Sequence, residues 1–377
     1  MKLFILFLVS VLLYHPCLAN SVGYGSSDAV YSAKNQEFFY MGFLLGLDKG
    51  LDRGKRNEVL GQLKTAQIAD GKHLSAVRSA TKLVDEGVSV VSGFPTSHEA
   101  LLAAKVARDK DRIFISAAAA HSDMATLGKN IFTLGESVTK SKKALIQFVS
   151  QKLPGKKGLL LSNERFVFSV NQASILKDVN LRMGNVLNLE EKPLSEDHQV
   201  SEEVLKSLKA GEYGYIIITT YADDSTKLLE QFVKSGVSVP IIANSSWTIG
   251  NIELVRRSLL KVKSPVFCVA SVVKGLPTSK RFEAEYQEKY NKPPETEMYY
   301  GYDLGQVVAQ AINRIPEKLT PESFAKAFRE NLCFKDTTTG RVCFPAEGGH
   351  AVRNIYWLKF SKKSGFLPTN SQPRMGE

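Results

Sequence analysis

The chain lacks any long hydrophobic run beyond its first twenty residues. A membrane-spanning helix needs about 20 consecutive apolar residues, and no later segment approaches that length. The sequence also contains no low-complexity segment and no tandem repeat of the short period that is typical of solenoids. These absences argue against a membrane-embedded body and a repeat architecture. They predict a soluble globular protein, and the 44% of hydrophobic residues is ordinary for one.

The common catalytic signatures are also absent. There is no G-x-S-x-G nucleophile turn, no glycine-rich phosphate loop ending in Lys-Ser or Lys-Thr, and no H-E-x-x-H zinc motif. Gly23 and Gly25 lack the third glycine of a dinucleotide-binding turn, and no pair of carboxylates stands out in the loops that follow the expected strands. We therefore expect a protein that is not an enzyme and that uses no cofactor.

The positive charge of the chain is not gathered into a nucleic-acid-binding element. The formal net charge is +11, but the lysines and arginines are scattered, and no basic helix carries interleaved aromatic residues. This pattern argues against a nucleic-acid partner and favours a solvated basic surface. The alternative is that the charge steers the protein toward an anionic ligand or a membrane surface.

Residues 1–19 have the features of a secretory signal peptide. Lys2 supplies the positive charge, and residues 3–14 are an apolar stretch too short to span a bilayer. For a cleavage site after Ala19, the small residues Cys17 and Ala19 occupy positions −3 and −1. We therefore expect residues 1–19 to be removed and the mature protein to be periplasmic or secreted.

Three of the four cysteines lie beyond the expected signal peptide. In an oxidising compartment, Cys333 and Cys343 could form a disulfide, and so short a loop would gain at most about 3 kcal/mol from chain entropy. Cys268 lies in the apolar run of residues 265–270 and is expected to be a buried free thiol.

Two strand-like runs, residues 88–91 and 113–115, are followed by loops of mostly tiny and hydroxyl residues and are separated by a helical segment. A strand–helix–strand unit of this length is a parallel crossover, and ligands of open parallel sheets lie beyond the carboxyl ends of the strands. Exposed backbone N–H groups and hydroxyls in such loops can hold a small polar molecule. Alternatively, these loops are small and polar only because short loops usually are, and Ser97 could simply cap a helix that starts at His98.

His98 and His121 follow the two runs and could be neighbours. A zinc pair is conceivable, but no cysteine or carboxylate partner is evident in the sequence, so we expect no metal.

Two series of alternating strands and helices follow each other, the second beginning near Thr139, and the length is compatible with two domains. The pattern predicts a helix over residues 36–51, in which Gly42 and Gly46 would let the helix lie close to a sheet. A loose alternation over residues 57–66 predicts a strand.

The ordered set of segments resembles the type I periplasmic binding proteins, in particular the leucine/isoleucine/valine-binding branch of ABC-transporter receptors. The segments that carry the resemblance span nearly all of the mature chain: FFYMGFLLGL, KLVDEGVSVVSGF with IFISAAAAHSDM, YGYIIITTYADDSTKLLEQFVKSGVSVPIIANSSW, RFEAEYQEKYNKPPETEMYYGYDLGQVVAQAI, GRVCF and IYWLKF.

The resemblance implies an α/β fold of two doubly wound parallel-sheet lobes joined by a hinge that the chain crosses several times. Residues 20–138 with 273–338 would form one lobe, and residues 139–272 with 339–377 the other. A solute would bind between the lobes of a monomer and be delivered to an ABC transporter permease. A ligand-sensing domain for a membrane signalling partner is the alternative, and a hydrolase that depends on Ser97 is a third possibility.

The resemblance also implies a set of solute-binding residues in the loops of both lobes. The acidic residue that pairs with an amino acid's ammonium should fall within residues 244–247, which contain no carboxylate, and Ala120 stands where the family has a hydroxyl. Asp223 or Asp224 could substitute, although a helix N-cap is the simpler role for either. The implied ligand-binding residues are Thr96, Ser97, Ala118, Ala120, Phe166, Tyr221, Ser246 and Trp247.

Overall fold

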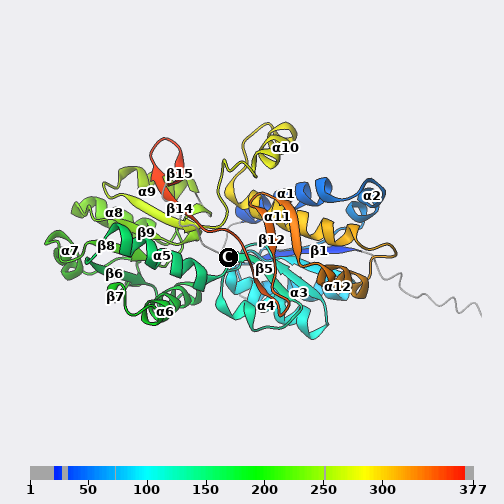
Figure 1. Cartoon of the computed structure of the whole chain (residues 1–377), viewed down its shortest axis with the longest axis horizontal. Helices are drawn as coiled ribbons and strands as arrows, with labels where there is room; N and C mark the ends of the chain where they lie inside the picture. The colour runs from blue at the N-terminus through cyan, green and yellow to red at the C-terminus, as the bar shows by residue number, and fades with distance from the viewer. Residues whose placement is uncertain (1–20, 28–32, 73, 250–251, 370–377) are drawn as a thin grey trace, which may run out of the picture.

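The computed structural model describes residues 21–27, 33–72, 74–249 and 252–369, so the expected signal peptide lies outside the described residues. The described part forms two α/β lobes that lie side by side (Figure 1). We call residues 21–136 with 274–351 the first lobe, and residues 138–270 with 354–369 the second lobe. The predicted fold class, two parallel-sheet lobes, is confirmed.

The first lobe is built on a six-stranded parallel sheet in the order β13-β5-β4-β3-β1-β2. Its inner strands are buried along their whole length, because helices cover both faces of the sheet. The strands are β1 (Val22–Ser27), β2 (Lys64–Ile68), β3 (Val90–Gly93), β4 (Ile113–Ser116), β5 (Ile131–Glu136) and β13 (Gly349–Ala351).

The second lobe is built on a seven-stranded sheet in the order β15-β14-β10-β9-β8-β6-β7. Its first five strands in the chain are parallel, and the last two add antiparallel at one edge. The strands are β6 (Lys157–Ser162), β7 (Asn188–Pro193), β8 (Tyr215–Ile218), β9 (Ile241–Ala243), β10 (Val266–Ala270), β14 (Tyr356–Ser361) and β15 (Gly365–Pro368). Cys268 lies in β10 as a buried free thiol.

Helices flank both sheets (Figure 1). Those of the first lobe are α1 (Ala33–Gly50), α2 (Arg53–Gly61), α3 (Ser75–Asp85), α4 (Ser97–Asp109), the 3₁₀ turn η1 (Ser122–Ala125), α10 (Lys280–Tyr290), α11 (Thr296–Asn313) and α12 (Pro321–Glu330). Those of the second lobe are α5 (Val138–Lys152), α6 (Val167–Arg182), α7 (Glu202–Lys209), α8 (Thr226–Ser235), the 3₁₀ turn η2 (Ser245–Thr248) and α9 (Ile252–Lys261).

Gly42 and Gly46 of α1 face α11 at very close range, and not the sheet as the glycine spacing suggested. A Cβ added at Gly42 would lie 2.1 Å from the carbonyl oxygen of Met298, and one added at Gly46 would lie 2.2 Å from that of Tyr302. The two glycines therefore serve a helix–helix contact, which a spacing of four residues favours as much as a helix–sheet contact.

The predicted strand over residues 57–66 is wrong. Helix α2 occupies residues 53–61, and β2 begins only at Lys64. Val59 is the only buried residue of α2, so this short helix has almost no apolar face from which a helical period could be recognised.

The chain crosses between the lobes near residues 136–138, 271–273 and 352–354. The expected boundary at residues 338 and 339 is wrong, because β12 (Gly340–Cys343) pairs with β11 (Cys333–Thr337), and β13 pairs with β5. Val342 and Ala351 pack in the same core as α1 and α11. The third crossing therefore comes after residue 351.

Buried polar contacts fix the crossings. The hydroxyl of Ser271 donates a 2.8 Å hydrogen bond to the carboxylate of Glu136, which joins the first crossing to the second. On the third crossing, Arg353 lies 3.0 Å from Asp303 of α11, and both side chains are fully buried. Two charges so deeply buried are tolerated only as a pair.

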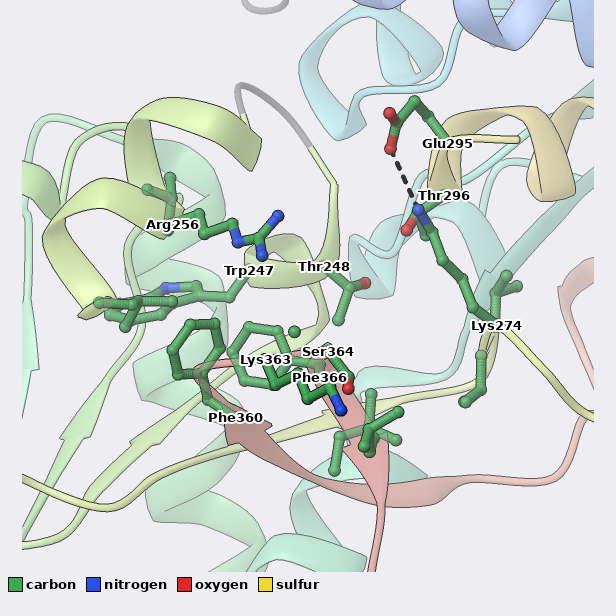
Figure 2. A pocket seen from close by; sticks show the side chains of 17 residues that line it. Trp247, Thr248, Arg256, Lys274, Glu295, Thr296, Phe360, Lys363, Ser364 and Phe366 are labelled. Atoms are coloured by element: carbon green, nitrogen blue, oxygen red, sulfur yellow. Dashed lines mark hydrogen bonds and ion pairs between the residues drawn. The ribbon is translucent and has the colours of Figure 1, made fainter. Parts of the chain in front are cut away.

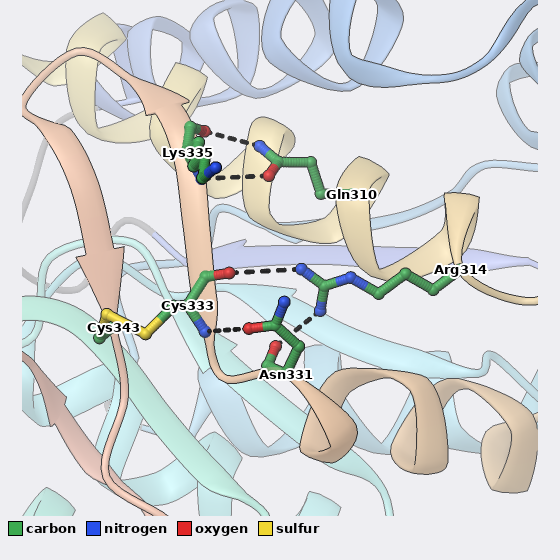
Figure 3. The surroundings of a disulfide bond; sticks show 6 residues. All are labelled: Gln310, Arg314, Asn331, Cys333, Lys335 and Cys343. Atoms are coloured by element: carbon green, nitrogen blue, oxygen red, sulfur yellow. Dashed lines mark hydrogen bonds between the residues drawn. A yellow bond between two sulfur atoms is a disulfide. The ribbon is translucent and has the colours of Figure 1, made fainter.

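The short antiparallel pair β11–β12 is fastened to α11 (Figure 3). Cys333 and Cys343 form a disulfide with a Cα–Cα distance of 4.0 Å. Gln310 of α11 donates to the carbonyl of Lys335 at 2.7 Å and accepts from its N–H at 3.1 Å, and Arg314 donates to the carbonyl of Cys333 at 3.3 Å. These bonds hold the end of the first lobe's chain against α11 just before the third crossing.

Candidate functional site

The two loops singled out by the sequence meet at the carboxyl edge of the first sheet. Ser97, the first residue of α4, accepts a 3.3 Å hydrogen bond at its Oγ from the N–H of Ala120 in the loop after β4. Thr96, and not Ser97, is the N-cap, with its hydroxyl accepting from the N–H of Glu99 at 3.4 Å. Among the described residues, no group accepts the hydroxyl proton of Ser97, so that proton is available to a solute.

Backbone hydrogen bonds hold the alanines of the loop after β4. Ala118 is half-buried and Ala120 is buried. The neighbouring carbonyl of Ala119 accepts a 2.6 Å hydrogen bond from the hydroxyl of Thr133 on β5. Thr133 thus fastens this loop to strand β5.

Two aromatic pairs lie in the loops of the second lobe. Tyr221 stacks on Phe168 with ring centroids 4.3 Å apart and planes 15° apart. Phe166, which was expected to bind solute, is the N-cap of α6 and stacks on His198 with ring centroids 5.7 Å apart. Phe166 and Phe168 both stand at the start of α6, and Phe168 is the one that packs on Tyr221.

The loop after β9 is held tightly from within. Trp247 donates from Nε1 to the carbonyl of Thr220 at 3.3 Å, and Asn244 donates to the same oxygen at 3.1 Å. Ser246 is 4% exposed, and its Oγ has no hydrogen-bond partner among the described residues. A buried hydroxyl without a partner is uncommon and marks a place where a solute could bind.

Neither acidic residue of the loop after β8 caps the following helix. Helix α8 begins at Thr226 with Ser225 as its N-cap, so the expected capping role of Asp223 or Asp224 is wrong. Burial raises the pKa of Asp224, and the charge of nearby His198 opposes that rise.

The two lobes touch where these loops face each other. Asn171 on α6 donates a 2.8 Å hydrogen bond to the hydroxyl of Ser122 on η1, and its amide oxygen accepts from the Ser122 N–H at 3.5 Å. Helices α4 and α6 are also in contact. The loops that carry Ser97 and Tyr221 therefore belong to one interlobe face.

Glu99 is a buried carboxyl group on this face that the sequence did not reveal. One oxygen accepts from the Ser27 hydroxyl at 2.8 Å and from the Gln36 amide at 3.5 Å, and the other has no hydrogen-bond partner among the described residues. Burial raises the pKa of Glu99 to about 7. Burial raises the pKa of Tyr221, and the charge of Glu99 is the next largest cause of that rise.

A separate cavity of about 370 Å³ lies beside the crossings and is lined by both lobes (Figure 2). Trp247, Phe360 and Phe366 form an apolar wall, and Arg256, Lys274 and Lys363 contribute positive charge. Lys274 is paired with Glu295 at 3.1 Å. Of the residues expected to bind solute, only Trp247 lines this cavity.

The described residues hold no group of three or more His, Cys, Asp or Glu side chains that could bind a metal ion. His121 accepts a 3.2 Å hydrogen bond at Nδ1 from the Asp123 N–H, and its carbonyl lies 3.1 Å from Nε2 of His350. Within the same part of the chain, no helix has both the length and the hydropathy to cross a membrane.

Solved structures with this fold come from several bacteria. A leucine binding protein from Thermotoga maritima is 17% identical, with a TM-score of 0.76 over 92% of this chain and 97% of that one. A branched-chain amino acid transporter substrate binding protein from Streptococcus pneumoniae, in complex with isoleucine, is 18% identical, with a TM-score of 0.74 over 93% and 100%. A solute binding protein of an ABC transporter from Rhodopseudomonas palustris, in complex with 3,4-dihydroxybenzoic acid, is 18% identical, with a TM-score of 0.71 over 92% and 95%.

A search of curated proteins finds no match to this chain. The periplasmic binding protein family, in contrast, matches residues 69–365, which is most of the chain and includes parts of both lobes. The family expected from the sequence is thereby confirmed. This chain belongs to the periplasmic binding protein family, and its fold is that of the leucine/isoleucine/valine-binding receptors.

Proposed function

We propose that the protein is an exported receptor that captures a small solute between its lobes and delivers it to the permease of an ABC importer. The observation that carries the proposal is the shared interlobe face, on which a free hydroxyl proton of Ser97 and the stacked ring of Tyr221 come from different lobes. Structures of the same fold hold leucine, isoleucine or a dihydroxybenzoic acid. These neighbours support a small carboxylate as the solute class.

Capture requires the solute to favour the closed arrangement over an open one. A solute that contacts both lobes gains its second set of contacts only on closure, so it shifts the population toward the closed form. Moving the ratio of closed to open from 1:99 to 99:1 takes about 5.5 kcal/mol of differential affinity. The crossings near residues 136–138, 271–273 and 352–354 are the places where such a motion would bend the chain.

Mass spectrometry of small molecules released by denaturing the purified mature protein tests the proposal directly. Thermal-shift screening of the stripped protein with amino acids, aliphatic acids and aromatic acids should be run beside it. We expect a released or stabilising solute that is recovered chemically intact. A protein that releases nothing and is stabilised by none of these compounds would not be a receptor of this kind, and chemical conversion of the solute would indicate an enzyme instead.

A further inference from the structure

The cavity beside the crossings has no part in the proposed capture of a solute. It has a volume of about 370 Å³, and residues of both lobes and of the second crossing line it (Figure 2). Ser97 and Tyr221 do not line it, and the indole N–H of Trp247, which does, is already donated to Thr220. The cavity is therefore a second place where a small molecule could bind.

Most of the lining of this cavity is apolar. Val272 of the second crossing, Leu259 of α9 and Leu358 of β14 are at most 2% exposed. Phe360 and Phe366, on the two strands of the β14–β15 hairpin, meet edge to face with ring centroids 5.4 Å apart. Both rings are only partly covered by protein. An apolar group in the cavity would therefore remove apolar surface from water, which is favourable.

The charged residues of the cavity leave an excess of positive charge. Lys274 is paired with Glu295 at 3.1 Å. Arg256 and Lys363 also line the cavity, both are exposed, and neither pairs with a carboxylate among the described residues. Figure 2 shows the guanidinium of Arg256 reaching from α9 toward the first-lobe side of the cavity. A guanidinium is well suited to bind a carboxylate through two parallel hydrogen bonds.

We propose that this cavity is a second binding site, which takes a small amphiphilic anion: a carboxylate on an apolar body. Arg256 and Lys363 attract the carboxylate, and the apolar body lies against Phe360 and Phe366. Ligand pockets typically measure about 300–1,000 Å³ and combine a mainly apolar lining with a few polar groups, and this cavity has both properties. The inference goes beyond the proposed function and does not depend on which solute binds between the lobes.

An occupant of this cavity would link the two lobes. Lys274 and Thr296 line it from the first lobe, Arg256 and Phe366 line it from the second, and Val272 lies on the crossing between them. A molecule that contacts both lobes favours the arrangement in which both can be contacted. The second site would thus stabilise the closed arrangement, and by linkage it would raise the affinity for a solute held there.

Loose packing of the β14–β15 hairpin is the simpler explanation of the cavity, but it accounts for less. It explains an apolar gap, and it gives no reason for two unpaired cations to border that gap. The chain has many scattered cations, but Arg256 and Lys363 stand beside a concave apolar space that both lobes line. A membrane surface is a poorer occupant, because it takes up an apolar face that protrudes, whereas Phe360 and Phe366 line a cavity.

The test compares octanoate with 1-octanol, which has a chain of the same length and no charge, by titration calorimetry on the stripped mature protein. The charge variant combines Arg256→Gln with Lys363→Gln, and Phe366→Ala alters the apolar wall. Lys261→Gln is the matched control, since Lys261 is an exposed cation of α9 that does not line the cavity. Tyr221→Ala reports on the interlobe face.

We expect octanoate to bind equally well to the wild type, Lys261→Gln and Tyr221→Ala, and 1-octanol to bind the wild type about tenfold more weakly. The charge variant should lose this preference for the anion, and Phe366→Ala should weaken both compounds about tenfold. If Phe366→Ala fails to fold, the charge variant decides, because both of its changes are at exposed positions. Octanoate should also decrease the radius of gyration of the wild type in small-angle scattering.

Absence of octanoate binding, or equal losses in Lys261→Gln and the charge variant, would overturn the inference. A loss in Tyr221→Ala as large as that in Phe366→Ala would overturn it too, because octanoate would then occupy the interlobe face. Sedimentation with vesicles of phosphatidylglycerol and phosphatidylcholine, without binding of octanoate, would indicate a membrane contact instead. Bound octanoate with an unchanged radius of gyration would refute the link between the lobes.

Discussion

Asn171 of α6 and Ser122 of η1 are joined by two hydrogen bonds although they belong to different lobes. The shorter one, from the Asn171 amide to the Ser122 hydroxyl, measures 2.8 Å. These bonds exist only while the lobes are together, so they stabilise the closed arrangement and no other. Their strength sets part of the balance between the closed and open forms.

Asn171→Ala should therefore weaken solute binding without unfolding the protein. A hydrogen bond contributes about 1 kcal/mol net, so the dissociation constant should rise about fivefold as the population shifts toward the open form. Calorimetry gives the affinity, and small-angle scattering of the solute-free protein should show a larger radius of gyration. Val170→Ala, a change at an exposed neighbour on α6, is the control. Unchanged affinity and radius in Asn171→Ala would show that the contact does not influence closure.

Tyr221→Ala should weaken binding by an order of magnitude or more. The change removes a ring that stacks on Phe168 at the interlobe face, and such aromatic pairs are worth about 0.5–1.5 kcal/mol beyond their buried area. Tyr221→Phe keeps the ring and should retain most of the affinity. Titration calorimetry on both variants, with circular dichroism to check folding, measures the effect. Equal affinity in Tyr221→Ala and the wild type would remove Tyr221 from the site.

Trp247→Ala should also weaken binding about tenfold or more, because the ring braces the loop after β8 through its hydrogen bond to Thr220. Phe366→Ala is the informative comparison, since Phe366 lines the cavity of Figure 2 together with Trp247, but its side chain cannot hydrogen-bond to Thr220. We expect Phe366→Ala to leave affinity unchanged. If both variants lose affinity equally, the solute occupies that cavity and not the face that carries Ser97.

Replacing both Cys333 and Cys343 by serine should lower stability and spare solute binding. The disulfide closes a loop with a sequence separation of ten residues, for which chain entropy gives at most about 3 kcal/mol. Urea unfolding of the oxidised wild type, the reduced wild type and the double variant measures the difference. A reduced wild type as stable as the oxidised protein would show that the hydrogen bonds from Gln310 and Arg314 hold the hairpin on their own.

The solute-free protein should lose stability as the pH rises from about 4.5 to about 7. Burial raises the pKa of Glu99 from its ordinary 4.5 to about 7 in the folded state. The stability is therefore fully present below the unfolded value and is lost as the pH rises through the folded value.

Glu99→Gln removes this contribution, so the free energy of unfolding of the variant relative to wild type should rise by up to about 3 kcal/mol across that range. Tyr24 and Tyr221 also feel the charge of Glu99, but burial raises the pKa of each phenol far above this range. Urea titrations of both proteins at several pH values provide the check. Parallel curves would show that Glu99 does not titrate there.

The fold could be predicted because buried parallel strands appear as continuous apolar runs between amphipathic helices. Residues 215–218, for example, carry four large apolar side chains and form the interior strand β8. The ends of the first lobe could not be predicted in the same way. Strands β12 and β13 are three or four residues long, and their partners are chosen by packing on α11 and β5 rather than by any local pattern.

The sequence predicted which loops form the candidate site, but it did not predict the buried carboxyl group of Glu99. Hydroxyl and small residues after a strand indicate where a sheet binds ligands, and Ser97 and Ala120 do meet there. The sequence alone does not single out Glu99, because a carboxylate in the first turn of a helix is common and is stabilised by the helix dipole. Only the packing of β1 and α1 over it shows that it is buried.

The close packing of α1 on α11 has a consequence for how the chain is made. Gly42 and Gly46 need Met298 and Tyr302 as neighbours, and about 250 residues, including the five parallel strands of the second lobe, separate the two helices. During synthesis or export, α1 has no packing partner until the parallel strands of the second lobe and then α11 have emerged. The five parallel strands of the second lobe are therefore complete in the emerging chain before α11, the partner that the first lobe needs, is made.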